Sequence, residues 1–238
     1  MKVIIGLVSK HKETNKRRTL TYVCDEMKDV LFKNNAIAIG IIPSMKKITL
    51  VDQLNEAEIY NNLENLFTQQ EKEDMISQIS LCNGVVLSGG SESYAYEMWI
   101  AKYCYENDIP ILGICAGHNN LIRGIGGRTK KVANPEIHSQ PELDYVHSIN
   151  IDKSSNFYHF VNVENMKVNS RHKNIIDNPA NLSIAAYDEF GNIEVTEDKT
   201  KKCFLGMRFH PESLYSIDKL HNVIFQKFID ICKKDTSL

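Results

Sequence analysis

A cysteine between two glycines stands at the end of an apolar run and is positioned to act as a nucleophile. Residues 109–118 read Ile-Pro-Ile-Leu-Gly-Ile-Cys-Ala-Gly-His, and an amphipathic segment follows directly. This pattern predicts a strand, a sharp turn and a helix, with Cys115 projecting at the turn and Gly113 and Gly117 leaving room for the strained backbone. The unpaired N–H groups and the dipole at the start of that helix would favour a thiolate.

A histidine and a carboxylate near the other end of the chain supply the partners that such a thiol needs. Residues 206–212 read Gly-Met-Arg-Phe-His-Pro-Glu. A thiol nucleophile requires a base, and the base requires a third group that fixes its orientation. An isolated cysteine is more often a buried packing residue. Cys115 together with His210 and Glu212 instead predicts a Cys-His-Glu triad.

The first half of the chain alternates short apolar runs with amphipathic segments. The runs that predict strands are residues 3–8, 36–42, 84–87 and 109–114. The segments with helical spacing of apolar residues are 18–34, about 54–82, and 92–107. Strands alternating with helices predict βαβ units, and therefore a parallel sheet covered by helices on both faces.

The second half favours neighbouring strands and one closing helix. The predicted strands are residues 145–151, 182–188, 192–196 and 203–209, with a hairpin-type turn at 189–192. The apolar spacing in residues 214–234 predicts the closing helix. Cys115 and His210 both follow predicted strands directly. We therefore expect them at the carboxyl edge of the sheet, where open α/β sheets bind ligands.

Five segments together resemble the class I glutamine amidotransferase-like superfamily and, within it, the γ-glutamyl-γ-aminobutyrate hydrolase family. They are residues 3–6, 86–90, 113–117, 168–172 and 206–212. The resemblance implies a flavodoxin-like three-layer α/β sandwich: a mostly parallel central sheet, helices on both faces, and a small antiparallel section in the C-terminal half. It also implies that residues 1–238 form one amidotransferase-like domain.

The resemblance assigns roles to the catalytic residues. Cys115 is then the nucleophile, His210 the general base and acid, and Glu212 the carboxylate that orients the imidazole. The backbone N–H groups of Ala116 and of Gly89 or Gly90 would form the oxyanion hole. The implied reaction is hydrolysis of a small γ-glutamyl amide through a Cys115 thioester, which releases glutamate and an amine.

The sequence departs from the hydrolase pattern around the nucleophile. Residues 116–119 read Ala-Gly-His-Asn, which is closer to the amidotransferases than the Arg-Gly-Met-Gln often found in the hydrolases. Arg208 stands where glutamine is common. An alternative function is therefore a glutaminase subunit that delivers ammonia to a separate synthase. A non-catalytic binding relative is a further alternative, against which the intact triad argues.

Several residues near these motifs are candidates for substrate contact. His118, Tyr94, His172 and Arg208 are the first four, each of which could instead have a packing or surface role. Arg17 belongs to a basic cluster after the first strand, which could bind an anionic part of the substrate or form a solvated loop.

Composition limits the remaining possibilities. The 238 residues are 42% hydrophobic with a net charge of −2, which argues against a general nucleic-acid or membrane-surface binder. Because neither a signal peptide nor a membrane-spanning stretch is evident, we expect a cytoplasmic protein. The 6 cysteines lack C-x-x-C spacing and the 8 histidines lack His-x-x-x-His spacing, so we expect reduced thiols, no metal and no cofactor. Relatives are often dimers, so a homodimer is compatible with the resemblance.

Overall fold

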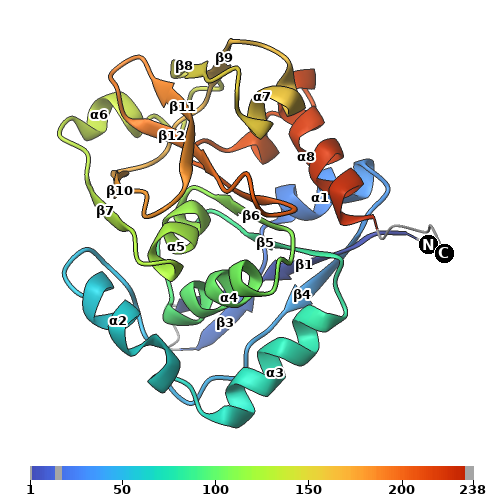
Figure 1. Ribbon diagram of the computed structural model, residues 1–238, viewed down its shortest axis with the longest axis vertical. Helices are drawn as coiled ribbons and strands as arrows, with labels where there is room; N and C mark the ends of the chain where they lie inside the picture. The colour runs from blue at the N-terminus through green and yellow to red at the C-terminus, as the bar shows by residue number, and fades with distance from the viewer. Residues whose placement is uncertain (1, 14–17, 234–238) are drawn as a thin grey trace.

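A nine-stranded sheet with helices on both faces forms the centre of the molecule in the computed structural model, which describes residues 2–13 and 18–233 (Figure 1). In spatial order the strands are β4 (Ile37–Ile41), β1 (Ile4–Val8), β5 (Gly84–Leu87), β6 (Ile111–Ile114), β13 (Phe204–Met207), β12 (Ile193–Glu197), β11 (Ser183–Asp188), β8 (His147–Ile151) and β9 (Asn165–Val168). The predicted α/β class with a layered sheet is confirmed.

The first five strands of this order are parallel, as the sequence predicts. Every residue of β5 and of β6 is buried, because helices cover both faces of the sheet there. Leu87 of β5 pairs with Gly113 of β6, and Ile114 of β6 pairs with Met207 of β13. The register therefore brings the carboxyl ends of these three strands side by side.

The remaining four strands are antiparallel and continue the same sheet. β13 pairs with β12, β12 with β11, β11 with β8, and β8 with β9. The predicted turn between β11 and β12 is present, with Gly191 at φ +84°. These strands gather with α6 (Pro135–His138) and α7 (Asn156–Val161) in the upper part of Figure 1.

Two separate apolar cores lie on the two faces of the sheet. One core includes side chains from α1 (Asp25–Lys33), α7 and α8 (Lys219–Cys232). The other includes side chains from α2 (Glu56–Asn62), α3 (Gln69–Ser80), α4 (Ala95–Glu106) and α5 (Ala116–Gly124). None of the helices in the described part of the chain combines the length and the apolarity that crossing a membrane would require.

Two predicted helices are only partly right. Within the predicted helix 18–34, β3 (Thr19–Tyr22) instead pairs with β2 (Lys10–Glu13), and the helix begins only at Asp25. The Thr-Leu-Thr-Tyr sequence of β3 contains residue types that favour strands. The predicted helix 54–82 is divided by a 3₁₀ turn (Leu63–Asn65), and α3 starts at a capping box formed by Thr68 and Glu71.

One further pair of strands lies outside the sequence prediction. β7 (Arg128–Lys131) pairs with β10 (Asn174–Asn178) in a separate two-stranded sheet. Three of the four residues of β7 are basic, so no apolar alternation marks the strand in the sequence. The short helix α6 and strand β9 likewise have too few residues to produce a periodic signal.

Candidate active site

Cys115 occupies the sharp turn between β6 and α5. Its backbone has φ +52° and ψ −103°, a conformation that non-glycine residues rarely adopt and that costs about 1–3 kcal/mol. The Cys115 N–H donates to the Met207 carbonyl at 2.8 Å, so the turn is tied to the neighbouring strand β13. The residue is the N-cap of α5, a helix whose nine residues are all buried. The strand, sharp turn and helix that the sequence predicts are therefore present, with Cys115 at the turn.

The glycines on either side of Cys115 let the helix approach the sheet closely. A Cβ atom on Gly117 would lie 1.9 Å from the Leu87 carbonyl oxygen. A Cβ atom on Gly113 would lie 2.7 Å from the Leu121 side chain and 2.8 Å from the Gly117 carbonyl oxygen. Any larger residue at these positions would push α5 away from β5 and β6.

His210 and Glu212 meet Cys115 at this edge. Nδ1 of His210 donates to Oε1 of Glu212 at 2.7 Å, and both side chains are buried. Nε2 of His210 makes no hydrogen bond within residues 2–13 and 18–233, which leaves it available to the Cys115 thiol. The His210 ring and the Cys115 side chain both lie beside Gly89. A Cβ atom added at Gly89 would be 2.6 Å from His210 Cε1 and 3.6 Å from Cys115 Cβ.

The charges of this group favour an ion pair between thiolate and imidazolium. Burial opposes protonation of His210, but the nearby Glu212 carboxylate and the Cys115 thiolate outweigh it and raise the His210 pKa. Burial also opposes ionisation of Cys115, but His210 and Arg208 outweigh it and lower the Cys115 pKa. The arrangement can therefore supply a reactive thiolate together with a proton donor.

Asn169 holds the backbone of His210. Its Oδ1 accepts from the His210 N–H at 2.7 Å, and its Nδ2 donates to the His210 carbonyl at 2.8 Å. The sequence marks residues 168–172 as a family-like segment but gives Asn169 no role. The structure gives this segment a role, because the oxygen and the nitrogen of one buried side-chain amide together fix the backbone of the predicted base.

Arg208 lies beneath the elbow. Its Nη1 donates to the Cys115 carbonyl at 3.0 Å and to Oδ1 of Asn119, and its Nη2 donates to the Asn174 carbonyl. Arg208 as a whole is 1% exposed, although it forms part of the cavity wall. These contacts with protein acceptors make Arg208 a support of the strained turn, in addition to any contact with substrate.

A cavity of about 900 Å³ opens over Cys115. Its wall includes Gly90, Ala116, Asn119, His210 and Arg208 near the thiol. Farther out it is formed by residues 50–54, 91–93, Arg123, Lys131, Ser139, Pro141 and 171–174. Segments that are far apart in the sequence thus surround the Cys115 side chain.

A buried ion pair supports the glycine turn on one side of this cavity. Nζ of Lys10 lies 2.7 Å from Oε1 of Glu97, and the other carboxylate oxygen accepts from Asn120 at 2.9 Å. The stem of Lys10 packs against Gly90, where a Cβ would lie 2.8 Å from Lys10 Cδ. In the sequence Lys10 belongs to the basic cluster after the first strand, but it is 2% exposed and has a structural partner.

Two of the residues expected to contact substrate are directed elsewhere. His118 is fully buried, its Nε2 lies 2.7 Å from Thr196 Oγ1, and burial lowers its pKa well below the ordinary histidine value. The Tyr94 hydroxyl donates to the His11 carbonyl and lies 2.7 Å from Glu92 Oε2. Neither side chain lines the cavity in the described part of the chain, so both are better explained by packing.

The remaining candidates for substrate contact and for the oxyanion hole lie in different places. His172 lines the cavity, and its Nδ1 donates to the Asn174 carbonyl at 3.0 Å. Gly90 and Ala116 also line the cavity, whereas Gly89 packs against the His210 ring. Arg17 lies outside the described residues.

Comparisons with known proteins agree with this geometry. The family model for Glutamine amidotransferase class-I matches residues 44–231. Anthranilate synthase component 2 of Cyanophora paradoxa is 30% identical over 164 residues, which cover 66% of this chain and 80% of that protein. A glutamine-hydrolyzing GMP synthase subunit of Methanosphaera stadtmanae is 30% identical over 177 residues, which cover 73% and 88% respectively.

The fold is also similar to that of a solved structure. A glutamine amidotransferase from Thermotoga maritima superposes with a TM-score of 0.62 at 14% identity, over 98% of this chain and 100% of that chain. The more specific resemblance to the γ-glutamyl-γ-aminobutyrate hydrolases finds no counterpart among these relatives, which are synthase components. The family match extends over most of the chain, and the chain belongs to the class I glutamine amidotransferase family.

Proposed function

We propose that this protein hydrolyses the side-chain amide of glutamine through a thioester on Cys115 and supplies the ammonia to a separate synthase. The observation that carries the proposal is the meeting of Cys115, at its strained turn, with the His210–Glu212 pair. The family and the names of the relatives, a synthase component and a glutamine-hydrolyzing synthase subunit, support glutamine as substrate. They favour this function over the free γ-glutamyl hydrolase that the sequence suggests.

In the proposed reaction the Cys115 thiolate attacks the amide carbon of the glutamine side chain. The carbonyl oxygen then becomes negative, and the N–H groups of Ala116 and Gly90 would stabilise it, each donor contributing about 3 kcal/mol to lowering the barrier. The protonated His210 transfers its proton to the departing nitrogen, and the C–N bond breaks to release ammonia. A water molecule that gives its proton to His210 then attacks the thioester and releases glutamate.

The cavity wall carries charges of both signs, which suits an amino acid with a carboxylate and an ammonium group. Lys131, Arg171 and Lys173 provide cations on one part of the wall. Asp52 and Glu92 provide carboxylates on another. An α-carboxylate could pair with the first group and an α-ammonium with the second.

Apolar residues at the mouth of this cavity support a partner protein. Leu50 is 51% exposed and Leu54 is 96% exposed, and both line the cavity. Ile48, two residues before Leu50, is also exposed. A synthase chain covering this rim would bury these side chains and would keep ammonia from escaping to solvent.

A second candidate is hydrolysis of a larger γ-glutamyl amide without a partner. The size of the cavity favours it, since about 900 Å³ is at the upper end of the range for pockets that hold drug-sized ligands and far exceeds the needs of glutamine. In that case the outer wall around residues 50–54 would contact the amine portion of the substrate.

The test is an assay of the purified protein against glutamine and a panel of γ-glutamyl amides, with Cys115→Ala as the matched control. We expect glutamate and ammonia from glutamine, and a γ-glutamyl adduct on Cys115 when the intact protein is analysed by mass spectrometry after rapid quenching. The alanine variant should give neither, since it lacks the sulfur.

The outcomes separate the two candidates. Turnover of a larger amide far faster than glutamine would favour the free hydrolase. An alanine variant as active as the wild type, or a wild type that forms no adduct with any member of the panel, would overturn both.

A further inference from the structure

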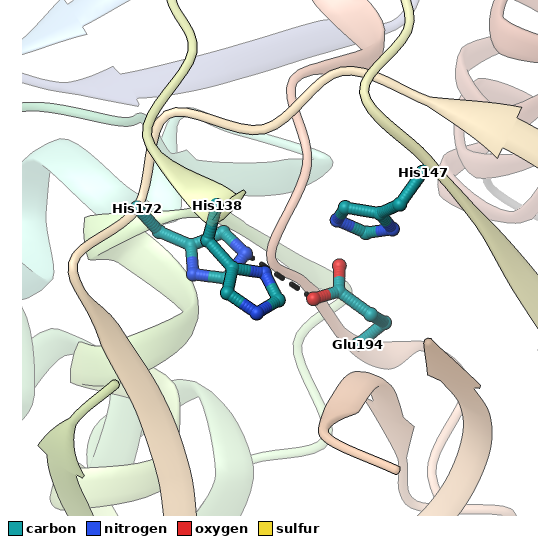
Figure 2. A group of neighbouring side chains, drawn as sticks. All are labelled: His138, His147, His172 and Glu194. Atoms are coloured by element: carbon teal, nitrogen blue, oxygen red, sulfur yellow. Dashed lines mark ion pairs between the residues drawn. The ribbon is translucent and has the colours of Figure 1, made fainter. Parts of the chain in front are cut away.

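Three histidines and a glutamate that are distant in the sequence meet outside the proposed catalytic triad (Figure 2). His138 ends α6, His147 begins β8, His172 lies between β9 and β10, and Glu194 lies in β12. One potential ligand atom from each of the four lies within 4.8 Å of all the others, and all four residues are buried. In Figure 2 the His147 ring lies above the Glu194 carboxylate, and the rings of His138 and His172 lie to its left.

Most of the side-chain polar atoms of this cluster lack the hydrogen bonds that buried polar groups normally make. Within residues 2–13 and 18–233, both ring nitrogens of His147, Nδ1 of His138, Nε2 of His172 and both carboxylate oxygens of Glu194 have no hydrogen-bond partner. An unpaired buried polar group destabilises the folded state, and a charged one does so more strongly. Six unpaired polar atoms in one buried cluster indicate that a ligand binds among them.

The His172 ring identifies the kind of ligand. Its Nδ1 donates to the Asn174 carbonyl at 3.0 Å, so in the neutral ring Nε2 carries a lone pair. That nitrogen faces Oε1 of Glu194 at 3.2 Å without hydrogen-bond geometry. Two electron-rich atoms at this separation favour a cation held between them.

We propose that His138, His147, His172 and Glu194 bind a divalent transition-metal ion of the zinc class. Imidazole nitrogens and a carboxylate oxygen are ligands that zinc accepts in tetrahedral sites. With bonds of about 2.0–2.1 Å, neighbouring ligand atoms in a tetrahedron lie about 3.4 Å apart. The 3.2 Å separation of His172 Nε2 and Glu194 Oε1 is close to that spacing, and side-chain rotation can bring in the other two ligands.

The surroundings match the needs of such an ion. The Asn174 carbonyl orients His172, as backbone carbonyls orient metal-binding histidines elsewhere. Asp188 is buried, with its Oδ2 3.8 Å from Nδ1 of His138. The carboxylates of Asp188 and Glu194 place acidic groups beside the ion.

Four protein ligands fill a tetrahedral shell, so the ion would stabilise structure instead of activating a substrate. In the segment that runs from His138 to His172, it would join both ends to β8 at His147 and to β12 at Glu194. Part of this segment forms the cavity wall, and Asn169 within it holds His210. The sequence-based expectation of no metal rests on linear spacing alone, which cannot detect ligands contributed by four separate elements.

The first test measures zinc binding by the full chain after removal of metal with a chelator. Wild-type protein and Cys115→Ala should each bind one zinc ion per chain in calorimetry, because the site does not include the reactive thiol. Cobalt(II) in place of zinc should give the visible absorption of a tetrahedral nitrogen–oxygen site without the thiolate charge-transfer band. Absence of stoichiometric binding, or a thiolate band, would overturn the proposal.

Substitutions then locate the site. His147→Ala removes a ligand whose ring makes no hydrogen bond in the described chain, and Glu194→Gln keeps the shape of the side chain. Both should weaken zinc binding at least about 100-fold, since even changes outside the ligand shell cost about 10–100-fold. The matched controls are His159→Ala and Glu164→Gln, which alter exposed residues of the same types.

Thermal unfolding provides a readout that does not depend on activity. Zinc should raise the melting temperature of the wild type and of both controls, and should leave that of His147→Ala unchanged. If His147→Ala fails to fold, the zinc response of Glu194→Gln and the cobalt spectrum of the wild type decide the question. Equal stabilisation of the ligand variants and the controls would refute the site.

Discussion

The parallel and antiparallel halves of the central sheet carry their polar residues in different ways. In the parallel half, Cys115 and His210 follow the ends of adjacent strands, and each is identified by a short local motif. In the antiparallel half, His147 and Glu194 lie within strands and meet His138 from the end of α6 and His172 from a loop. The parallel half thus forms its reactive group from strand ends, whereas the antiparallel half forms its cluster from residues with no common motif.

This difference has a physical origin. Parallel strands all direct their carboxyl ends to one edge, so residues that directly follow different strands must converge there. Antiparallel strands alternate in direction, so residues from their two ends and their loops converge only through the particular register of the sheet. The following predictions test how independent the two halves are.

The largest effect is expected for Glu212→Gln in the parallel half. The variant keeps the size of the side chain but removes the charge that stabilises protonated His210, and it should lower kcat by about 10²- to 10⁴-fold. The wild-type Cys115 pKa is lowered through the paired imidazolium, so its thiolate should persist below the usual cysteine range. In the variant, the rate of Cys115 alkylation should therefore rise at a higher pH than in the wild type.

The alkylation rate measured against pH checks this prediction. Glu189→Gln, at an exposed position, is the control and should keep the wild-type profile. Identical profiles for Glu212→Gln and the control would contradict the proposed pairing of Cys115 with His210.

Gly117→Ala should cause the largest loss of stability. The added Cβ would lie 1.9 Å from the Leu87 carbonyl oxygen, which belongs to the backbone and cannot rotate away. We expect the free energy of unfolding to fall by about 3 kcal/mol or more, the upper range for overpacked positions. Urea denaturation measures it, with Gly40→Ala as the control because its Cβ would make an ordinary contact at 3.6 Å. Equal losses in both variants would show that α5 can move away from the sheet.

Asn169→Ala tests the link between the two halves. The variant leaves the N–H and the carbonyl of His210 without their partner, and we expect a loss of about 1–3 kcal/mol in stability. Because His210 would be less well positioned, kcat should fall while KM changes little. Steady-state kinetics with the proposed substrate measures both, and Asn165→Ala, at an exposed position in β9, is the control. A change in KM alone would indicate a substrate contact instead of a positioning role.

The sequence predicts the parallel half well, and the reasons are local. Short apolar runs, the turn glycines and the two motifs around Cys115 and His210 are each contained within about ten residues, where periodicity and turn chemistry operate. The contacts with Lys10, Asn169 and Arg208 are not predictable in the same way. Lys10 is 87 residues from its partner Glu97, and Asn169 is 41 residues from His210. Arg208 is 93 residues from Cys115, so only the folded chain brings these pairs together.

The cluster around Glu194 is the strongest example of this limit. A buried glutamate in a strand and three isolated histidines each have an ordinary explanation when considered alone. The segment 168–172 provides a partial signal, since it is family-like and contains His172. His138 and His147 have no such signal, because each lies nine or more residues in the sequence from every other member of the cluster.

The smallest effect is expected for Gly191→Ala, at the turn between β11 and β12. Gly191 has φ +84°, but a Cβ there would meet no atom within 4 Å, so the cost is conformational only and should be about 1 kcal/mol. Gly191→Asn should cost less, because asparagine tolerates positive φ better than alanine. Thermal unfolding of both variants measures this order, and kcat should equal that of the wild type. A loss in kcat would mean that the antiparallel hairpin is coupled to Cys115, and the two halves would then not be independent.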